Sequence, residues 1–217
     1  MALADLQDLV NDLIRDEGTE ISVTQRDRAI ELARFQYSRN RPRRLTETLT
    51  ADANGKLPFP VAWEDGFSEF TYAALGDIDP VLSVIETQAG QSIKTERSLN
   101  EGDNVEVVYT ALHMADGVTY TISTVDQQAV ASWAAAALLG QLATKHAGDE
   151  DSTIQTDAVN QQTQSQRYSS RSKALQAQYY ELLGIKPGKP KPAFAVADMD
   201  LKTSRGRSRI WHSGKYR

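Results

Sequence analysis

The sequence of 217 residues contains no cysteine and only three histidines. Without cysteine the chain has no disulfide framework, no thiolate metal site and no cysteine nucleophile. The N-terminus lacks a basic flank followed by an unbroken apolar core, so we expect no signal sequence and an intracellular product. The most apolar segment, Val125–Ala147, is interrupted by glutamine and lysine, which argues against a membrane span.

Motifs that mark common catalytic sites are also missing: there is no GxSxG, P-loop, GxGxxG or HExxH. The histidines are scattered, at His113, His146 and His212. His146 precedes Asp149–Asp151, which suggests a metal site, but we favour a histidine at a helix C-terminus followed by a solvated acidic loop. Asp77 and Asp79 are expected in a turn before Pro80 rather than as paired catalytic carboxylates. The sequence predicts no enzyme, cofactor or metal site.

Two amphipathic helices are predicted before any strand. Residues 2–16 place leucine, valine and isoleucine on one face and aspartate on the other. The acidic residues of that outer face include Asp5, Asp8 and Asp12. Residues 24–39 form the second helix, for which Thr24 is the expected N-cap and Asp27 occupies the capping-box position. Its expected inward-facing residues are Ala29, Ile30, Ala33 and Tyr37.

The segment Val125–Ala147 is predicted to be the central buried helix of the chain. Alanine dominates its apolar stripe, and small side chains let neighbouring elements approach closely, while Trp133 fills the one wide gap. Thr124 is its expected N-cap and Gly148 its expected end. A fourth helix is predicted over 155–183, which is mostly polar and is anchored by a narrow apolar stripe.

Between the second and third helices, at about 44–122, the pattern changes to short segments of β type separated by turn residues. The expected strands lie at 45–50, 67–74, 81–87 and 104–111. Residues 56–61 contain two prolines and are expected as an edge strand or loop, and 118–122 leads into the central helix. The predicted fold class is therefore mainly α: a bundle of about four helices with a small antiparallel β insertion and an extended C-terminal arm.

Charge divides the chain into an acidic domain, 1–185, and a basic arm, 186–217. The arm has nine basic and two acidic residues, whereas the domain has 15 basic and 27 acidic residues. The arm is rich in proline near its start and too polar to form its own core, so it is either a solubilising tail or an extended docking segment. Aromatic residues among the cations favour docking. The candidate docking residues are Lys202, Arg205, Arg207, Arg209, Trp211 and Tyr216.

A second basic cluster surrounds the end of the second predicted helix. Its members are Arg34, Arg39, Arg41, Arg43 and Arg44. Such a cluster can supply the non-specific part of nucleic-acid affinity by contacting phosphates. It can equally complement a helix C-terminus and the acidic surface of a neighbouring subunit, which is the interpretation we favour.

Three segments of the sequence carry recognisable motifs. The second predicted helix has the pattern AxxxAxxxYS followed by a nearby proline, on Ala29, Ala33, Tyr37, Ser38 and Pro42. The run WEDGFS contains Trp63, Gly66, Phe67 and Ser68, and an alanine-rich run extends from Trp133 to Leu139. These three features resemble the second-helix signature, the insertion and the AAA-bearing third helix of the head-to-tail connector, or adaptor, proteins of tailed bacteriophages.

This resemblance implies a structural virion protein, made in the bacterial host cytoplasm and located in the neck at the capsid vertex. Family members form a ring, usually of twelve subunits, beneath the portal protein, and the C-terminal segment commonly docks on the portal. The implied partners are further copies of the chain, the portal, the next tail or stopper protein and the genomic DNA in the lumen, but no membrane. The alternative is a DNA-binding regulatory or packaging protein that uses the basic cluster and the arm.

Overall fold

The computed structural model describes residues 3–14, 20–76, 78–88, 90–116, 118–148 and 164–186. Contacts divide the chain into two units, Met1–Ile185 and Lys186–Arg217, and of the second unit only Lys186 is described. The candidate docking residues of the arm therefore lie outside the described residues. So do Gly117, Asp77, Asp149–Asp151, His212 and the first part, 155–163, of the fourth predicted helix.

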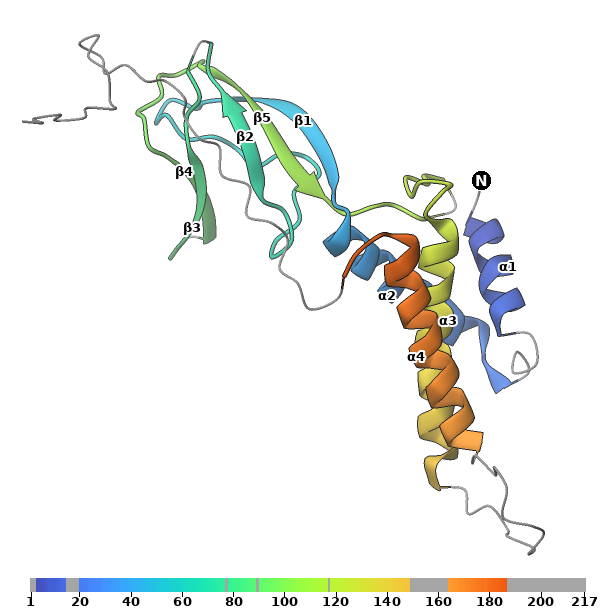
Figure 1. Cartoon of the computed structure of the whole chain (residues 1–217). Coiled ribbons are helices and arrows are strands. Elements are labelled where there is room, and N and C mark those ends of the chain that lie inside the picture. The colour runs from blue at the N-terminus through green and yellow to red at the C-terminus, as the bar shows by residue number, and fades with distance from the viewer. Residues whose placement is uncertain are drawn as a thin grey trace, which may run out of the picture. The chain divides into compact units, whose positions relative to one another are not determined.

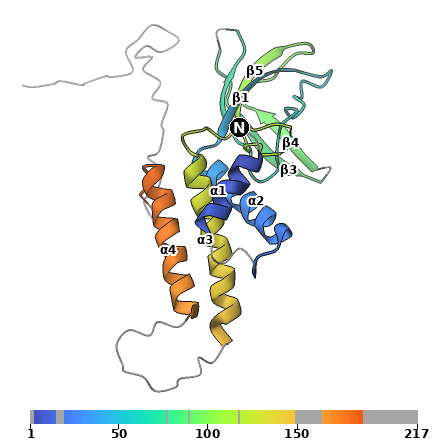
Figure 2. The same ribbon diagram turned by 90° about the vertical axis from the view of Figure 1, so that its right-hand side faces the viewer.

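Four helices, two before and two after the strands, form one part of the described structure, and one of them is central. Helices α1 (Leu3–Leu13), α2 (Val23–Asn40) and α4 (Gln164–Leu182) all pack against α3 (Gln127–Lys145). Figures 1 and 2 show α4 running alongside α3 over most of its length. A single 3₁₀ turn, His146–Gly148, follows α3. None of the described helices is long and apolar enough to cross a lipid bilayer.

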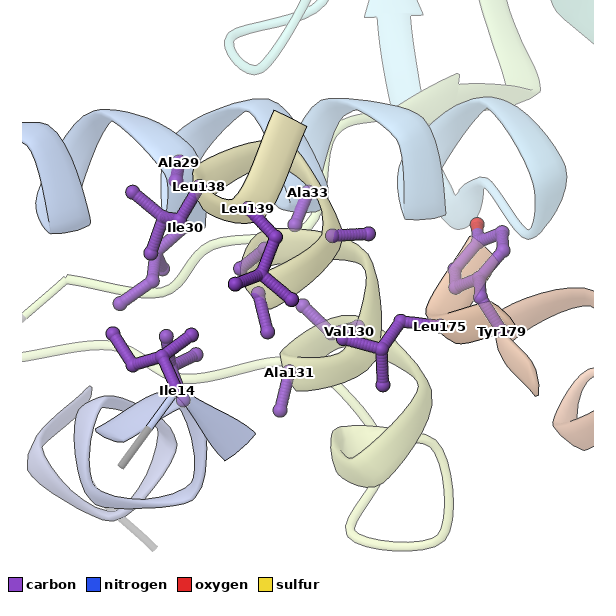
Figure 3. Packing of buried hydrophobic residues seen from close by; sticks show 14 of the residues in the cluster. Ile14, Ala29, Ile30, Ala33, Val130, Ala131, Leu138, Leu139, Leu175 and Tyr179 are labelled. Carbon is purple, nitrogen blue, oxygen red and sulfur yellow. The ribbon is translucent and has the colours of Figure 1, made fainter. Parts of the chain in front are cut away.

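Helix α3 is buried on almost every side because most of its side chains are small and apolar. Figure 3 shows side chains from α2, α3 and α4, together with Ile14, gathered in the resulting core. At the contact with α4, the Ser172 hydroxyl donates to the Ala136 carbonyl at 2.7 Å. Trp133 is only partly buried and packs against the rings of Tyr179 and Tyr180, with centroids 4.9 and 5.8 Å away.

Two predicted helix caps are wrong, although the helices themselves are present. Helix α2 begins one residue before Thr24, and Ser22 is its N-cap in a capping box with Gln25. The Ser22 hydroxyl accepts from the Gln25 amide, and the Gln25 side chain accepts from the Ser22 amide. Helix α3 has Asp126 at its N-cap position instead of Thr124, and its side chain does not bond the first turn.

The strands form two antiparallel sheets. In the first sheet, β5 (Asn104–Ala111) lies between β1 (Arg43–Thr50) and β2 (Phe70–Ala74). The second sheet is a hairpin of β3 (Leu82–Thr87) and β4 (Gly90–Thr95). The buried face of the first sheet carries Val105, Val107 and Tyr109, which pack in a second apolar cluster with residues such as Leu49 and Ile93.

These sheets correct the predicted fold class. Of the residues that the structure describes, 44% are helical and 23% are in strands, so the fold is mixed α/β and not mainly a helical bundle. Strand β4 was not predicted because its sequence, GQSIKT, has a single large apolar residue, Ile93. Residues 56–61 and 118–122 contain no strand, apart from an isolated bridge that pairs Tyr120 with Ala115. The sheet has its own buried cluster and is more than a small insertion.

Candidate functional site

The end of α2 and the start of α3 meet in a polar network, which we call the joint. It consists of Tyr37, Ser38, Asn40, Arg41, His113, Asp126 and Tyr179. Its centre is the carboxylate of Asp126, whose side chain is only 6% exposed. The Tyr37 hydroxyl donates to Oδ2 of Asp126 at 2.7 Å, and Nη1 of Arg41 donates to both carboxylate oxygens at 3.0 and 2.8 Å. A buried carboxylate needs such partners, because an unpaired one is strongly penalised by the loss of hydration.

The same arginine connects the joint to the end of α4. Nη2 of Arg41 donates to the carbonyl of Leu183 at 3.0 Å, one residue beyond the helix. The last carbonyls of a helix lack intrahelical donors, and a cation is favoured there by the helix dipole. Asn40 adds a second link, because its amide donates to the Tyr179 hydroxyl at 2.7 Å. The last turn of α2 therefore holds α3 and α4 together.

His113, two residues after β5, joins the sheet to α2. Its backbone amide donates to the Ser38 hydroxyl at 3.0 Å, and its carbonyl accepts from Nη1 of Arg34 at 3.2 Å. Its ring lies between two backbone carbonyls, with Nε2 at 2.9 Å from Arg41 O and Nδ1 at 3.0 Å from Thr121 O. The ring also packs on Tyr37, with centroids 4.8 Å apart. The joint thus connects the helical part to the sheet.

The two tyrosines of the joint are held in their neutral form. Burial, assisted by the hydrogen bond to Asp126, raises the pKa of Tyr37. Burial also raises the pKa of Tyr179 from its ordinary value of 10.0 to about 12, against a smaller lowering effect of the Asn40 hydrogen bond. Both phenols act as structural hydrogen-bonding groups at neutral pH.

We expect stability to depend on alkaline pH through Tyr179. Because the folded protein binds the phenol proton more tightly than the unfolded chain, the stabilisation is complete below pH 10 and is lost between about pH 10 and 12. Across this window, urea unfolding followed by circular dichroism should show a larger loss of unfolding free energy for the wild type than for Tyr179→Phe. Equal losses would contradict a buried neutral phenol at this position.

The structure distributes the predicted basic cluster over different environments. Arg39 is exposed near the end of α2, and Arg44 is exposed on β1, where Arg43 is half-buried. Arg41 and Arg34 instead have partners within the chain, the first in the joint and the second at the His113 carbonyl and at Glu31, 3.7 Å away. Contacts of this cluster with phosphate or a neighbouring subunit stay a prediction.

Sequence reasoning missed Asp126 as the centre of the joint and His113 as its link to the sheet. Asp126 lies 85 residues from Arg41 and 89 from Tyr37, so no local spacing connects them. The available signal was a lone aspartate immediately before the most apolar helix of the chain. A carboxylate in that position either caps the helix or pairs with a distant cation.

The WEDGFS run forms a tight turn beside the second apolar cluster. The amides of Phe67 and Ser68 donate to the Glu64 carbonyl at 3.1 and 2.9 Å, and the Ser68 hydroxyl accepts from the Glu64 amide at 2.9 Å. Gly66 has a φ of 76°, a conformation that favours glycine. The Trp63 ring packs on Phe70, with centroids 4.6 Å apart, so this turn closes one side of the sheet.

The side chains considered above as metal ligands or paired carboxylates, where the structure describes them, contact other residues of the chain. Nε2 of His146 lies 3.0 Å from a carboxylate oxygen of Glu20, and the Lys145 ammonium lies 2.9 Å from the same atom. The hydrogen bonds to Lys145, first, and to His146 lower the pKa of Glu20. Asp79 accepts from the Tyr72 hydroxyl at 2.8 Å. Within the described ranges, no three histidine or carboxylate side chains come close enough together to hold a metal ion.

Neither a scan against protein-family profiles nor a search of curated proteins finds a match for this chain. The resemblance to connector proteins therefore rests on the quoted residues alone. Of these, Ala29 and Ala33 are fully buried in the helical core, and Tyr37 and Ser38 belong to the joint.

Proposed function

We propose that the chain is a structural subunit of a ring in the neck of a tailed bacteriophage, between the portal and the tail. The observation that carries the proposal is the role of the AxxxAxxxYS segment. Its two alanines lie in the helical core, and Tyr37 and Ser38 connect that core to Asp126 and to His113 after the sheet. Two of the residues that resemble the family, Tyr37 and Ser38, are therefore among those that join the helices to each other and to the sheet.

A rigid joint suits a subunit whose function is to hold neighbouring copies in a fixed arrangement. A ring closes only if each copy presents its two contact surfaces at a constant angle, so bending between the helices and the sheet has to be small. A buried, fully bonded polar network restricts that bending more than an apolar contact does, because its hydrogen bonds are directional. His113 provides such a network between the sheet and α2 through its contacts with Ser38, Arg34 and Arg41. Asp126 in turn ties the end of α2 to α3.

Exposed apolar side chains agree with a subunit that assembles. Val61, Val81 and Val125 are 94, 57 and 85% exposed, and they lie on different segments of the described chain. Single exposed apolar residues are common on monomeric proteins, but several sites on both parts of the molecule provide surface for large interfaces. In the proposed ring these contacts surround a lumen through which the genomic DNA passes.

The proposal is tested by mixing the purified chain with the portal protein of the same phage and separating the species by gel filtration. We expect the intact chain to elute with portal particles and a chain ending at Gly184 to elute alone, because the arm docks on the portal. Circular dichroism of the shortened chain serves as the folding control. If neither chain joins the portal, the connector function is wrong.

The same preparation distinguishes the alternative of a DNA-binding protein. Phosphate contacts release counterions, so DNA affinity would fall steeply as salt concentration rises. Fluorescence anisotropy with a labelled duplex, measured at several salt concentrations, gives this slope directly. Strong, salt-dependent binding without association with the portal would favour a regulatory or packaging role for Arg39, Arg43, Arg44 and the arm.

A further inference from the structure

Strand β3 is an edge strand with a row of backbone groups that point away from its partner. It pairs only with β4 among the described strands (Figure 1). The Glu96 amide donates to the Val81 carbonyl at 3.3 Å, so these opposed residues form a hydrogen-bonded pair. Such pairs alternate with non-hydrogen-bonded ones, which turns the N–H and C=O groups of Leu82, Val84 and Glu86 to the free edge. Within the described ranges, no other group bonds them.

This edge lacks the features that keep edge strands from pairing with other chains. Natural edge strands carry lysine, proline or a bulge. The β3 sequence, LSVIET, contains no lysine, arginine or proline, and its register with β4 is regular. The other edge of the hairpin is different, because Ile93 of β4, whose backbone points to that edge, is only 5% exposed. The open edge of the hairpin is therefore that of β3.

Exposed apolar side chains lie on both faces of the β3 edge. Val81 and Ile85 are 57 and 39% exposed, and they share one face because they are an even number of residues apart. Val84 is 38% exposed and points to the opposite face, together with Leu82, which packs against the second apolar cluster. Apolar residues on both faces are typical of a strand inside a sheet, with a neighbour on each side.

The polarity of residues 81–85 is the same in both directions of the chain. Their sequence, VLSVI, has Ser83 at its centre and two apolar residues on each side. If two copies run antiparallel with Ser83 opposite Ser83, Val81 of each copy opposes Ile85 of the other, and Leu82 opposes Val84. Opposed residues point to the same face of a sheet. Every apolar side chain of the segment then gains an apolar neighbour from the second copy.

The same register also satisfies the backbone. Leu82 and Val84 become opposed hydrogen-bonded pairs, and each such pair exchanges both of its N–H···O bonds. Ser83 falls in a non-hydrogen-bonded pair, where the Cα atoms are only about 4.5 Å apart and a small side chain fits. A register shifted by two residues would instead place Leu82 opposite Glu86. The pairing ends after Ile85, because the next residue would oppose Pro80, which has no N–H.

We propose that two copies of the chain associate edge to edge through β3, antiparallel, with Ser83 at the two-fold axis. The product is a continuous sheet in the order β4–β3–β3–β4, and a hairpin gains stability from such additional strands because two strands alone are marginally stable. A contact between identical surfaces closes at two copies. Neighbouring copies in a ring with two different ends are not related by a two-fold axis, so this dimer is a state of the free chain and goes beyond the proposed function.

Single cysteines test the register directly, because the natural chain has none. Ser83→Cys places two thiols in the pair whose Cα atoms are about 4.5 Å apart, within the range that disulfides span. We expect this variant to form a covalent dimer in oxidised glutathione, read on a non-reducing gel. The matched control is Thr87→Cys, which is exposed on the same face of β3 but lies about 27 Å from its counterpart in this register. It should give at least about tenfold less dimer in the same time.

Lysines at the two outer apolar positions test the side-chain pairs. In Val81→Lys/Ile85→Lys every lysine opposes a lysine of the other copy, and like charges directly opposite are destabilising. Sedimentation equilibrium should give a dissociation constant at least about tenfold above that of the wild type, or about 1.4 kcal/mol. Mixing with Val81→Glu/Ile85→Glu should restore dimers, because each lysine then opposes a glutamate. This recovery distinguishes lost pairing from lost folding.

A control for net charge is Glu101→Lys, which changes the charge as much as the lysine variant does but at an exposed residue outside β3. It should dimerise like the wild type. The inference is overturned if the wild type stays monomeric up to about 1 mM, if Ser83→Cys forms no more covalent dimer than Thr87→Cys, or if the lysine and glutamate variants do not combine.

The portal experiment keeps this inference separate from the proposed function. If the chain joins the portal but fails the cysteine and charge tests, the ring function stands and the β3 contact is wrong. If both tests behave as expected but the chain never joins the portal, the β3 contact stands and the connector function is wrong.

Discussion

Replacing Asp126 with alanine is expected to lower the free energy of unfolding by about 3 kcal/mol. The carboxylate accepts from the Tyr37 hydroxyl and from Arg41, and its side chain is 6% exposed. Its removal leaves a buried phenol without an acceptor and a guanidinium without its counterion. Because Arg41 is 46% exposed and regains some hydration, we place the effect at the low end for a broken buried pair.

Urea unfolding followed by circular dichroism measures this loss. The matched control is Asp65→Ala, which removes an exposed carboxylate and should change the unfolding free energy by less than about 0.5 kcal/mol. A double-mutant cycle with Arg41→Ala should give a coupling energy of about 1 kcal/mol or more. An Asp126 variant as stable as the wild type would show that its contacts with Tyr37 and Arg41 do not stabilise the packing of α2 on α3.

Leu139→Ala should cost about 3 kcal/mol, within the range observed for fully buried leucines. The Leu139 side chain has no exposed surface and lies in the core to which α1, α2 and α4 all contribute. Figure 3 shows it among the side chains gathered around α3. Truncation removes apolar contacts and leaves a cavity. The surrounding helices fill this cavity only in part, because each of them is held in place by its own packing against α3.

The control for this variant is Leu182→Ala at the end of α4, where the leucine is 46% exposed. The same atoms are deleted, so the difference between the two variants reports burial alone. We expect the exposed variant to lose less than about 1 kcal/mol. If both variants lost the same small amount, α3 would not be the centre of the helical core.

Helical periodicity predicted the helices well because it is a local property of the sequence. The expected inward residues of α2, including Ala29, Ala33 and Tyr37, are all buried. The central position of α3 is confirmed as well. The caps were harder to predict, since Ser22 and Thr24 both fit an N-cap and the choice depends on geometry that the spacing of residues does not contain.

The sheet shows where local patterns stop being informative. Three of the expected strands overlap β2, β3 and β5, and LTETLT lies within β1. Pairing of β1 with β5, such as Leu45 with Tyr109, joins segments far apart in sequence. Treating the region as an insertion in a helical bundle underestimated it, because a strand such as β4 is stabilised by its partner and not by its own composition.

The joint could not be predicted from the sequence for the same physical reason, because its contacts join segments that are far apart in the chain. The arginines near the end of α2 were recognised as a cluster, but a cluster in sequence does not reveal that Arg41 turns inward to Asp126 while Arg39 is exposed. The side-chain direction is decided by α3 and α4, which supply a carboxylate and a free carbonyl. Tertiary partners therefore divide one basic cluster into structural and surface residues.

The central claim is that the chain forms a ring on the portal, and the most direct test is the mass of the complex. Mass photometry of portal particles, before and after addition of the intact chain, counts the added copies in steps of 24.0 kDa. We predict a single heavier species in which every portal particle has gained one complete ring, with no gain for the chain ending at Gly184. Unchanged portal particles, or a continuous spread of masses from random attachment, would contradict the claim.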